Sequence, residues 1–212
     1  MTLPWEKITP IKFPSSIGII TEAGANGYQY DDPYTKYAYS SWAHNTLIVN
    51  DKGLVEEKNI PNDYNYNGTY IDKYDINNPL NVSITGVTER YKNVKFERNV
   101  LYKKKKDMII VKDIVSSNVD NKYTILWNLA VDLDVKMINN NKLEVYRNDK
   151  RVMAIVIKSS SKYDISLIKG QKEPRLLGWM VKQGSDPIPT YVIKIDFYCN
   201  KKIKLITRFL LD

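Results

Sequence analysis

The stretch Tyr123-Thr-Ile-Leu-Trp-Asn-Leu-Ala-Val131 carries the clearest structural signal in the chain. Large apolar residues recur at every second position, namely Tyr123, Ile125, Trp127, Leu129 and Val131. A period of two is the repeat of a β-strand, in which successive side chains point to opposite faces of the sheet. The stretch is therefore predicted to be a strand with this apolar face on a hydrophobic core.

Further strands are predicted on both sides of this stretch. Residues Val94 to Val115 are expected to form a hairpin around the turn Lys103-Lys-Lys-Lys-Asp107, because apolar and β-branched residues flank this polar run. Three successive strands are expected downstream, at 135–138, 143–147 and 152–158. The separating turns, Asn139-Asn-Asn141 and Asn148-Asp-Lys150, consist largely of short polar residues that tolerate tight-turn backbone angles.

The end of the chain completes an all-β prediction. Two last strands are expected at Tyr191 to Cys199 and Ile203 to Leu211, and no window of twelve or more residues has a convincing helical stripe. The economical architecture is a large antiparallel β-sandwich of roughly a dozen strands. With 212 residues and 43% hydrophobic content, the chain can bury a substantial core, so we expect residues 1–212 to form a single domain.

Two segments, residues 22–42 and 59–80, break the strand pattern and are predicted to be long loops. Loops carried on a rigid sheet are a common place for binding sites, and tyrosine rings suit stacking on sugar faces. The rings in these segments are Tyr28, Tyr30, Tyr34, Tyr37, Tyr39, Tyr64, Tyr66, Tyr70 and Tyr74. An AT-rich genome that overuses Tyr, Asn, Ile and Lys explains any single ring equally well.

The charge of the chain favours a polyanionic partner. Thirty-two Lys and Arg residues against twenty-four Asp and Glu give a net charge of +8, which attracts nucleic acid or acidic polysaccharide over long distances. Only six of the cations are Arg, whereas direct reading of DNA bases relies on bidentate Arg contacts. We therefore expect no nucleic-acid partner, although much of the charge can serve solubility alone.

The sequence also limits the compartment and the cofactor. No run approaches the ~18 apolar residues of a membrane-spanning helix, so no membrane partner is expected. The first residues lack a secretory signal, so either the protein is cytoplasmic or a targeting segment lies outside this sequence. The single Cys199 excludes an internal disulfide and a cysteine-rich metal site, and its place on the apolar side of its strand is typical of a core residue.

His44 is the only histidine, and it is expected to begin the apolar strand His44-Asn-Thr-Leu-Ile-Val-Asn50. It directly follows the polar loop Ser40-Ser-Trp-Ala43, and a strand that starts beside a loop can hold a side chain firmly while it reaches a ligand. A lone histidine is more often structural than catalytic, so both roles stay open from composition.

The context of this histidine resembles a known family. The segment Tyr37-Ala-Tyr-Ser-Ser-Trp-Ala-His-Asn-Thr-Leu-Ile-Val-Asn-Asp51 is similar to the region around the β-domain histidine of the heparinase II/III-like polysaccharide lyases. Glu97-Arg98-Asn-Val-Leu-Tyr102, followed by Met108-Ile-Ile-Val-Lys-Asp113, resembles the family's Arg-containing strand and its V-x-D partner. Three further segments resemble the end of the family's β-domain, namely Gly178-Trp179, Pro187-Ile-Pro189 and Ile206-Thr-Arg-Phe209.

This resemblance implies a helical toroid followed by a C-terminal β-sandwich, with acidic polysaccharide bound in the cleft between them. It also implies β-elimination, which needs a group to neutralise a uronate carboxylate, a base for the α proton and an acid for the leaving oxygen. His44 maps onto the β-domain histidine, used as base or as partner to the carboxylate. The catalytic Tyr and the Asn or His neutraliser belong to the toroid, so the isolated chain is expected to be inactive or nearly so.

The departures from the family pattern matter as well. Zinc-binding members have a second histidine two residues after the first, where this chain has Thr46, so we predict no metal. Lys36 stands where the family often has Arg, and it is either a contact for a substrate carboxylate or a solvated charge. No Gly-rich phosphate loop, Ser nucleophile motif or Cys/His cluster is present, and no cofactor is expected.

The preferred hypothesis is the C-terminal β-sandwich part of a lyase that acts on uronate-containing polysaccharide, with His44 as its catalytic residue. Its partners would be the acidic polysaccharide and a helical toroid domain on the same or another chain. We predict that five residues contact the substrate, namely Lys36, Tyr37, Tyr39, Trp42 and Asn45. The alternative is a non-catalytic carbohydrate-binding module of the same fold. As part of a longer lyase, the chain would be secreted or located in the cell envelope.

Overall fold

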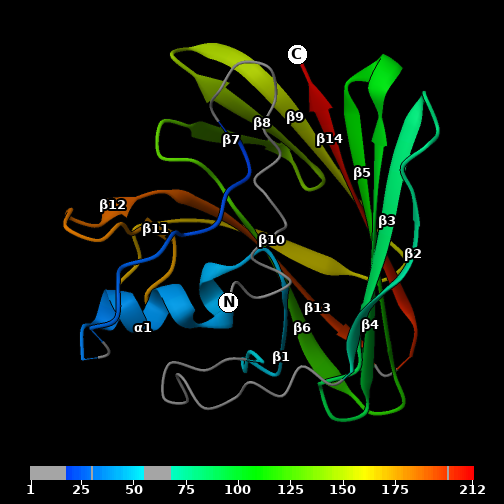
Figure 1. The fold of residues 1–212 in the computed structure, drawn as a ribbon, viewed down its shortest axis with the longest axis horizontal. Helices are drawn as coiled ribbons and strands as arrows, with labels where there is room; N and C mark the ends of the chain where they lie inside the picture. The colour runs from blue at the N-terminus through cyan, green and yellow to red at the C-terminus, as the bar shows by residue number, and fades with distance from the viewer. Residues whose placement is uncertain (1–17, 30, 55–67, 200) are drawn as a thin grey trace.

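The computed structural model describes residues 18–29, 31–54, 68–199 and 201–212. Within these ranges the chain forms fourteen β-strands, one short α-helix and two 3-10 turns. The strands lie in antiparallel sheets of eight, four and two strands, which confirms the predicted all-β sandwich. Figure 1 shows the large sheet curving from β2 to β7, with β6, β10 and β13 of the second sheet beneath its curve.

The eight-stranded sheet combines two local units that are joined by the last strand. In spatial order its strands are β2 (Thr69–Asp75), β3 (Asn81–Thr88), β4 (Val94–Lys103), β5 (Met108–Ser117), β14 (Ile203–Leu211), β9 (Lys150–Ser159), β8 (Lys142–Arg147) and β7 (Asp134–Asn139). β2 to β5 pair in sequence order, and so do β7 to β9. β14 pairs with β5 on one side and with β9 on the other, so it unites the two units.

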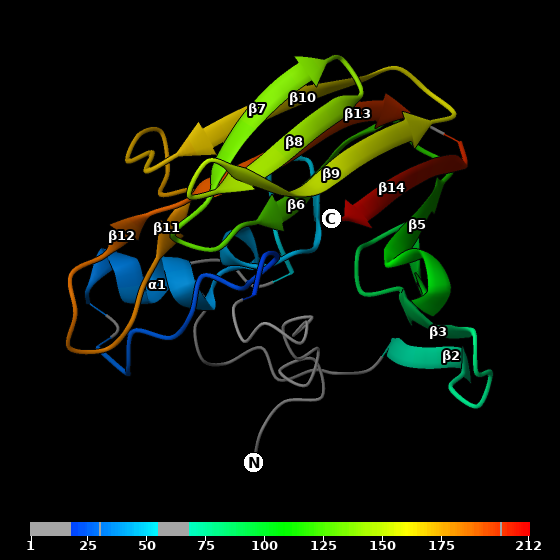
Figure 2. The ribbon, with the colours of Figure 1, turned by 90° about the horizontal axis from the view of Figure 1, so that it is seen from above.

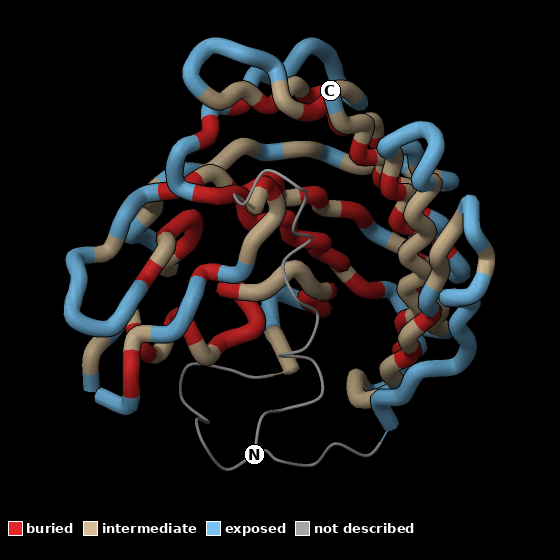
Figure 3. The backbone as a smooth tube through the Cα atoms, turned by 45° about the horizontal axis from the view of Figure 1, so that its top comes forward, coloured by how far each residue is buried: buried red, intermediate tan, exposed pale blue. Residues whose placement is uncertain are grey.

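The second sheet has four strands, in the order β1 (Leu47–Val49), β6 (Asn121–Asn128), β13 (Tyr191–Cys199) and β10 (Tyr163–Lys169). Its inner face packs on the eight-stranded sheet, where Ile125 and Trp127 of β6 meet residues such as Phe209 of β14. The rings of Trp127 and Phe209 are in edge contact, with centroids 5.1 Å apart. Figure 3 shows the buried residues gathered in this interior, with exposed residues mainly in the peripheral loops.

A second apolar cluster covers the outer face of the four-stranded sheet. It joins β6 and β13 to α1 (Pro33–Tyr39), to the 3-10 turn η1 (Ser41–Ala43) and to the two-stranded sheet of β11 (Trp179–Met180) and β12 (Ile188–Pro189). Figures 1 and 2 both place α1 beside β11 and β12. Because both faces of the four-stranded sheet are covered, Leu126 on the second face of β6 is as deeply buried as Ile125 on the first.

The predicted hairpin, three-strand unit and last two strands are confirmed. β4 and β5 pair around a turn that contains the 3-10 segment η2 (Lys104–Lys106) and Asp107 in the left-handed region, with φ of 41°. β7, β8 and β9 extend the predicted strands by one or two residues at most of their ends. Asn148 and Asp149 both have positive φ, at 48° and 62°, as a two-residue hairpin turn requires and as short polar side chains permit.

The prediction of two long loops is wrong in part. Residues 33–39 form α1, which is only two turns long and therefore too short to show a helical stripe. Asp32 caps it by accepting the backbone N–H of Thr35 at 2.7 Å, and Pro33 occupies its first position. Residues 69–75 form the edge strand β2, whose side chains are all exposed, so no apolar alternation marks it. Residues 59–67, with Tyr64 and Tyr66, and Tyr30 lie outside the described residues.

Two predicted strand boundaries also need correction. The strand expected from His44 to Asn50 is limited to Leu47–Val49, and His44 lies before it, at the end of η1. The central strand ends at Asn128, and Val131 beyond it is 41% exposed instead of facing the core. Beyond Asn128 only an isolated bridge between Leu129 and Ile20 continues the pairing, so apolar alternation in the sequence runs past the end of the strand there.

Candidate functional site

His44 lies at the connection between η1 and β1. It is the C-terminal cap of η1, and its backbone N–H donates to the carbonyl oxygen of Ser41 at 3.3 Å. The imidazole is 38% exposed, so the ring is accessible from solvent. Its Nδ1 lies 2.5 Å from Oε2 of Glu22, a carboxylate that is itself 43% exposed. The histidine is therefore held at one ring nitrogen, and the other nitrogen is not used by this pair.

Glu22 is brought to the histidine by the backbone on either side of it. The N–H of Thr21 donates to the carbonyl oxygen of Asn128 at 2.9 Å, and the N–H of Ala23 donates to that of Ala43 at 3.2 Å. The second carboxylate oxygen of Glu22, Oε1, accepts the side-chain amide of Asn45 at 2.9 Å. Both oxygens of Glu22 are thus engaged, and its orientation toward the ring is constrained.

Asn45 connects three separate parts of the chain. Its side-chain NH2 donates to the carbonyl oxygen of Thr21 at 2.8 Å as well as to Glu22. Its Oδ1 accepts the backbone N–H of Asn128, the last residue of β6, at 2.6 Å. Arg98 Nη1 donates to the backbone carbonyl oxygen of Asn45. We infer that Asn45 acts here mainly as a support for the His44 segment.

Arg98 is itself fixed between the two sheets. Its guanidinium forms two hydrogen bonds with Asp113, from Nε at 2.6 Å and from Nη2 at 2.9 Å, and Asp113 is 1% exposed. The guanidinium also lies 4.6 Å from the centroid of the Trp127 ring. The two strands that resembled family motifs, which carry Arg98 and Asp113, thus meet beneath the segment that carries His44.

The other predicted substrate contacts differ in exposure. Lys36 and Tyr39, in α1, are partly exposed. Tyr37 and Trp42 are 0% and 2% exposed, and burial raises the pKa of the Tyr37 phenol to about 12. Both rings pack in the apolar cluster beside α1 and η1 and support this segment, and a substrate contact for either of them stays a prediction. Alternating apolar and polar residues in a short helix do not reveal which ring faces inward.

Two residues that contact the His44 segment have no signal in the sequence. Glu22 is an isolated acid 22 positions before His44, in a segment predicted only as a loop. Arg175 comes from the connection before β11, and its guanidinium lies 4.0 Å from the centroid of the Trp42 ring. Both contacts depend on how distant segments pack, so no motif or spacing could have identified them.

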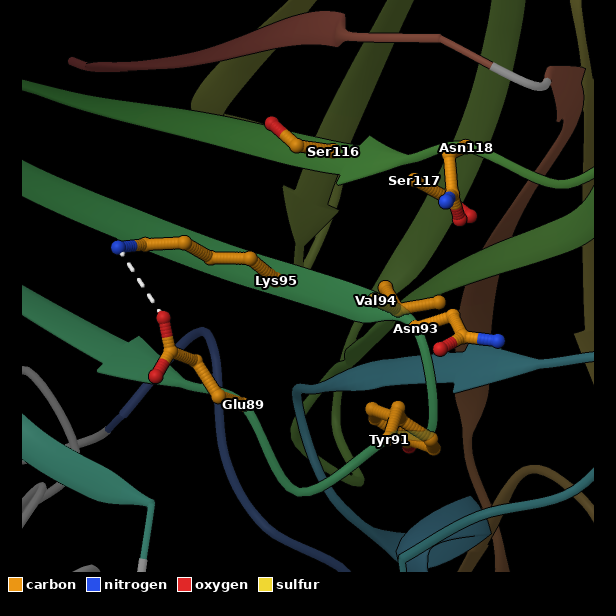
Figure 4. Close-up of a pocket in the computed structure, with 8 residues that line it drawn as sticks. All are labelled: Glu89, Tyr91, Asn93, Val94, Lys95, Ser116, Ser117 and Asn118. Carbon is orange, nitrogen blue, oxygen red and sulfur yellow. Dashed lines mark ion pairs between the residues drawn. The ribbon is translucent and has the colours of Figure 1, made fainter.

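A shallow hollow of about 430 Å³ lies elsewhere on the molecule (Figure 4). Its lining residues are Glu89, Tyr91, Asn93, Val94, Lys95, Ser116, Ser117 and Asn118. Lys95 Nζ and Glu89 form an ion pair of 3.2 Å across it, and the Tyr91 hydroxyl donates to the carbonyl oxygen of Leu47 at 2.5 Å. None of the predicted site residues lines the hollow, so it is not part of the candidate site.

The described residues offer neither a metal-binding cluster nor a membrane-spanning helix. Within those ranges no group of three or more His, Cys, Asp or Glu side chains is placed to hold a metal ion. No helix in the described part of the chain is both long and apolar enough to cross a membrane. The prediction that the protein uses no metal and no cofactor stays a prediction.

The fold and the site define a β-sandwich domain with a histidine–carboxylate pair at its margin. The family profile described as "Heparinase II/III-like, C-terminal" matches residues 17–181. The chain therefore belongs to the heparinase II/III-like family, as the sequence resemblance predicted. No curated protein matches this chain by sequence.

Solved structures with the same fold include two polysaccharide lyases. One is a heparinase III, with a TM-score of 0.71 and 11% identity over 91% of this chain and 28% of that chain. Another is the heparan sulfate lyase HepC from Pedobacter heparinus, with a TM-score of 0.68 and 14% identity over 93% of this chain and 29% of that chain. At these identities the likeness shows the fold alone. The present chain spans less than a third of the length of either protein.

Proposed function

We propose that this chain is the β-sandwich part of a lyase that cleaves a uronate-containing polysaccharide by β-elimination. The observation that carries the proposal is the accessible His44 ring with its Nδ1 held by Glu22. Membership of the heparinase II/III-like family supports the lyase class. The net charge of +8 supports an acidic substrate, because it attracts polyanions from a distance.

The proposed reaction has three parts. A base takes the proton from the carbon α to the uronate carboxylate, and the electron pair of that C–H bond forms a new C=C bond. The C–O bond on the neighbouring carbon breaks, and the glycosidic oxygen leaves with its electron pair and receives a proton from an acid. A cationic or hydrogen-bonding group must neutralise the carboxylate, since negative charge accumulates there as the proton leaves.

His44 can serve one of these parts through its Nε2 atom. A carboxylate only accepts hydrogen bonds, so Glu22 favours the tautomer with the proton on Nδ1 of His44. In the neutral ring Nε2 then carries a lone pair and can accept the α proton. In the protonated ring Nε2–H can instead donate to the substrate carboxylate. Both roles use the same atom, and Glu22 orients it in either case.

The exposure of the other predicted site residues indicates which of them can contact the substrate. We propose Lys36 and Tyr39 as substrate-binding residues, because their side chains are partly exposed on α1, which ends shortly before His44 in the chain. Asn45 already uses its side chain on Thr21, Glu22 and Asn128, so we propose it as a positioning residue.

The groups for the other catalytic tasks are proposed to come from a helical domain on the same or another chain. This chain spans only 28% of the heparinase III and 29% of HepC. The core-facing side of β2 and β3 also supports the proposal. Tyr74 and Ile84 are opposite one another and share the face of Val100, which packs on the core, yet they are 67% and 40% exposed. A second domain seated there would cover them.

The test is the ultraviolet absorbance of unsaturated products when the complete protein, with its helical domain, is incubated with heparan, chondroitin or alginate. His44→Ala is expected to lower kcat by roughly 100-fold or more. Glu22→Gln is expected to lower it at least about ten-fold, because an amide can donate to Nδ1 and so permits the opposite tautomer.

The matched control is Asp51→Asn, in the same segment as His44. The Asp51 carboxylate pairs with Lys122 Nζ at 2.7 Å and not with the histidine. Its activity should equal that of the wild type. Equal activity of His44→Ala and wild type, or no product from any acidic glycan, would contradict the proposal. If the chain still bound acidic glycans in the latter case, the carbohydrate-binding module would become the better hypothesis.

A further inference from the structure

Arg175 packs on an aromatic ring, whereas three other arginines of the chain form ion pairs with carboxylates. Three arginines have carboxylate partners within 2.6 Å, namely Arg98 with Asp113, Arg147 with Asp132 and Arg151 with Asp212. In the ranges that the structure describes, no Asp or Glu forms an ion pair with Arg175. Its contact is the face of an aromatic ring, and its side chain is partly exposed. The charge is thus available to a ligand.

The backbone that carries Arg175 is fixed. Residues 171–177 form a closed loop, because the backbones of Gln171 and Leu177 exchange two hydrogen bonds, of 2.9 and 3.1 Å. Inside the loop, Nε2 of Gln171 donates to the carbonyl oxygen of Arg175 at 3.1 Å. The indole of Trp179 donates to the carbonyl oxygen of Gln171 at 2.7 Å and ties the loop to β11. Little ordering of this loop would be needed when a ligand binds.

The guanidinium is seated on Trp42. It lies 4.0 Å from the ring centroid, and the indole is 2% exposed and therefore held rigidly by the core. Stacking on an aromatic face occupies one flat side of a guanidinium, whereas its N–H donors point outward in its plane. These donors match the spacing of the two oxygens of a carboxylate or sulfate group. Arg175 is therefore positioned in advance for bidentate recognition of an oxyanion.

We propose that Arg175, supported by Trp42, is a binding site for a carboxylate or sulfate group on an acidic sugar. Trp42 lies two residues before His44, in the 3-10 turn that His44 caps, so a sugar held here lies at the same end of the sandwich as the histidine. The inference rests on the proposed function, because it takes an acidic polysaccharide to be the ligand. It adds a substrate anchor separate from the histidine–carboxylate pair.

The experiment measures the affinity of the 212-residue chain for two oligosaccharides by isothermal titration calorimetry at low salt. One is an unsulfated uronate oligosaccharide of the heparosan type, and the other is its sulfated heparan counterpart. Arg175→Gln is expected to weaken binding roughly ten-fold, as loss of a charge-assisted hydrogen-bonded pair does. Arg175→Lys is expected to lie between wild type and Gln, because it keeps the charge and loses the planar fork.

Arg208→Gln is the matched control. It removes the same charge from β14, on the face opposite to the buried Phe209, and should change affinity by less than about two-fold. Thermal unfolding of each variant checks that the fold is intact, as expected for a side chain outside the core. A loss for both sugars supports a carboxylate ligand, and a loss for the sulfated sugar alone supports sulfate.

Equal affinities of the Arg175→Gln and Arg208→Gln variants would overturn the inference, and so would absence of wild-type binding to both sugars. These results are separable from the proposed function, which is read from product absorbance. Lyase activity with no effect of Arg175 on binding would leave the proposed function standing alone. A ten-fold loss of binding in a protein without lyase activity would leave the anion site standing alone.

Discussion

The two ends of the sandwich use polar side chains in opposite ways. At the end formed by β7, β8 and β9, charged residues pair near the surface of a backbone ladder that spans all three strands, as Arg151 does with Asp212 at 2.6 Å. At the end that carries His44, β1 has only three residues, and the neighbouring segments have little ladder of their own. There Arg98, Asn45 and Glu22 bond to backbone and side-chain atoms of distant segments.

This difference shows where polar contacts decide the structure. A backbone ladder satisfies its own donors and acceptors, so surface ion pairs add little to it. An irregular segment beside a core must find partners elsewhere, and side chains such as Asn45 and Arg98 supply them. The site end should therefore depend on a few individual polar residues, whereas the other end should tolerate their loss. Three substitutions test this expectation.

The largest effect is expected for Asp113→Ala. Asp113 is 1% exposed, and its removal leaves the guanidinium of Arg98 partly buried without its carboxylate. We expect a loss of about 3–5 kcal/mol in the free energy of unfolding, measured by urea denaturation. Asp212→Ala removes the partner of Arg151 at the other end and should cost far less, because both side chains are partly exposed. Equal losses for the two variants would refute the comparison.

A smaller effect is expected for Asn45→Ala. The change leaves the backbone N–H of Asn128 without its acceptor at 2.6 Å, which should cost about 1–3 kcal/mol of unfolding free energy. Asn139→Ala is the matched control, since that side chain accepts only the exposed backbone N–H of Asn141, at 3.0 Å. The control should stay within about 0.5 kcal/mol of wild type. A control as damaging as Asn45→Ala would contradict the expectation.

The smallest effect is expected at Asp32, the cap of α1. Asp32→Ala should cost about 1 kcal/mol at neutral pH in urea denaturation, because the N–H of Thr35 loses its acceptor. Burial would raise the pKa of Asp32, but hydrogen bonds from Thr35 and Asn26 outweigh it and hold the pKa below 3.8. A carboxyl with a lowered folded-state pKa stabilises the fold above pH 3.8, and this stabilisation is lost as the pH falls through the folded-state pKa.

Asp32→Asn isolates the acid dependence of this cap. The amide keeps an acceptor for Thr35 but cannot titrate, so the variant should lose less stability than wild type as the pH falls below 3.8. The other end has its own acid-sensitive group, because hydrogen bonds from Lys142 and Tyr146 lower the pKa of Glu144 to about 2. Glu144 contributes equally to wild type and to Asp32→Asn, so it does not change the difference between their pH profiles. An identical pH profile for wild type and Asp32→Asn would exclude the assigned role of Asp32.

Most of the fold was predictable from sequence, and the exceptions share a cause. The hairpin of β4 and β5 and the three strands β7 to β9 have apolar alternation and polar turns, both of which are local signals. α1 was missed because two turns show no clear helical period, although Asp32 and Pro33 are a usual helix start. β2 was missed because an edge strand with exposed faces has no apolar face to reveal it.

Of the candidate site, only His44 and the residues around it in the sequence were predictable. The surroundings of His44 resembled a family segment, and that family is now shown by the match over residues 17–181. Trp42 and Tyr37 were predicted as ligand contacts because the sequence does not distinguish an aromatic ring in a core from one on a surface. Both rings are buried because α1 and η1 pack against β6 and β11, which lie far away in the sequence.

Local sequence patterns establish that this protein is built from strands, where most of the strands lie and which segment carries the histidine. These properties depend on residues next to one another, whose alternation and turn preferences act over a few positions. The folded arrangement alone shows that β14 joins the two halves of the large sheet, that Glu22 holds His44 and that Arg175 stacks on Trp42. Such contacts depend on the order and register of strands far apart in the chain, which no local pattern encodes.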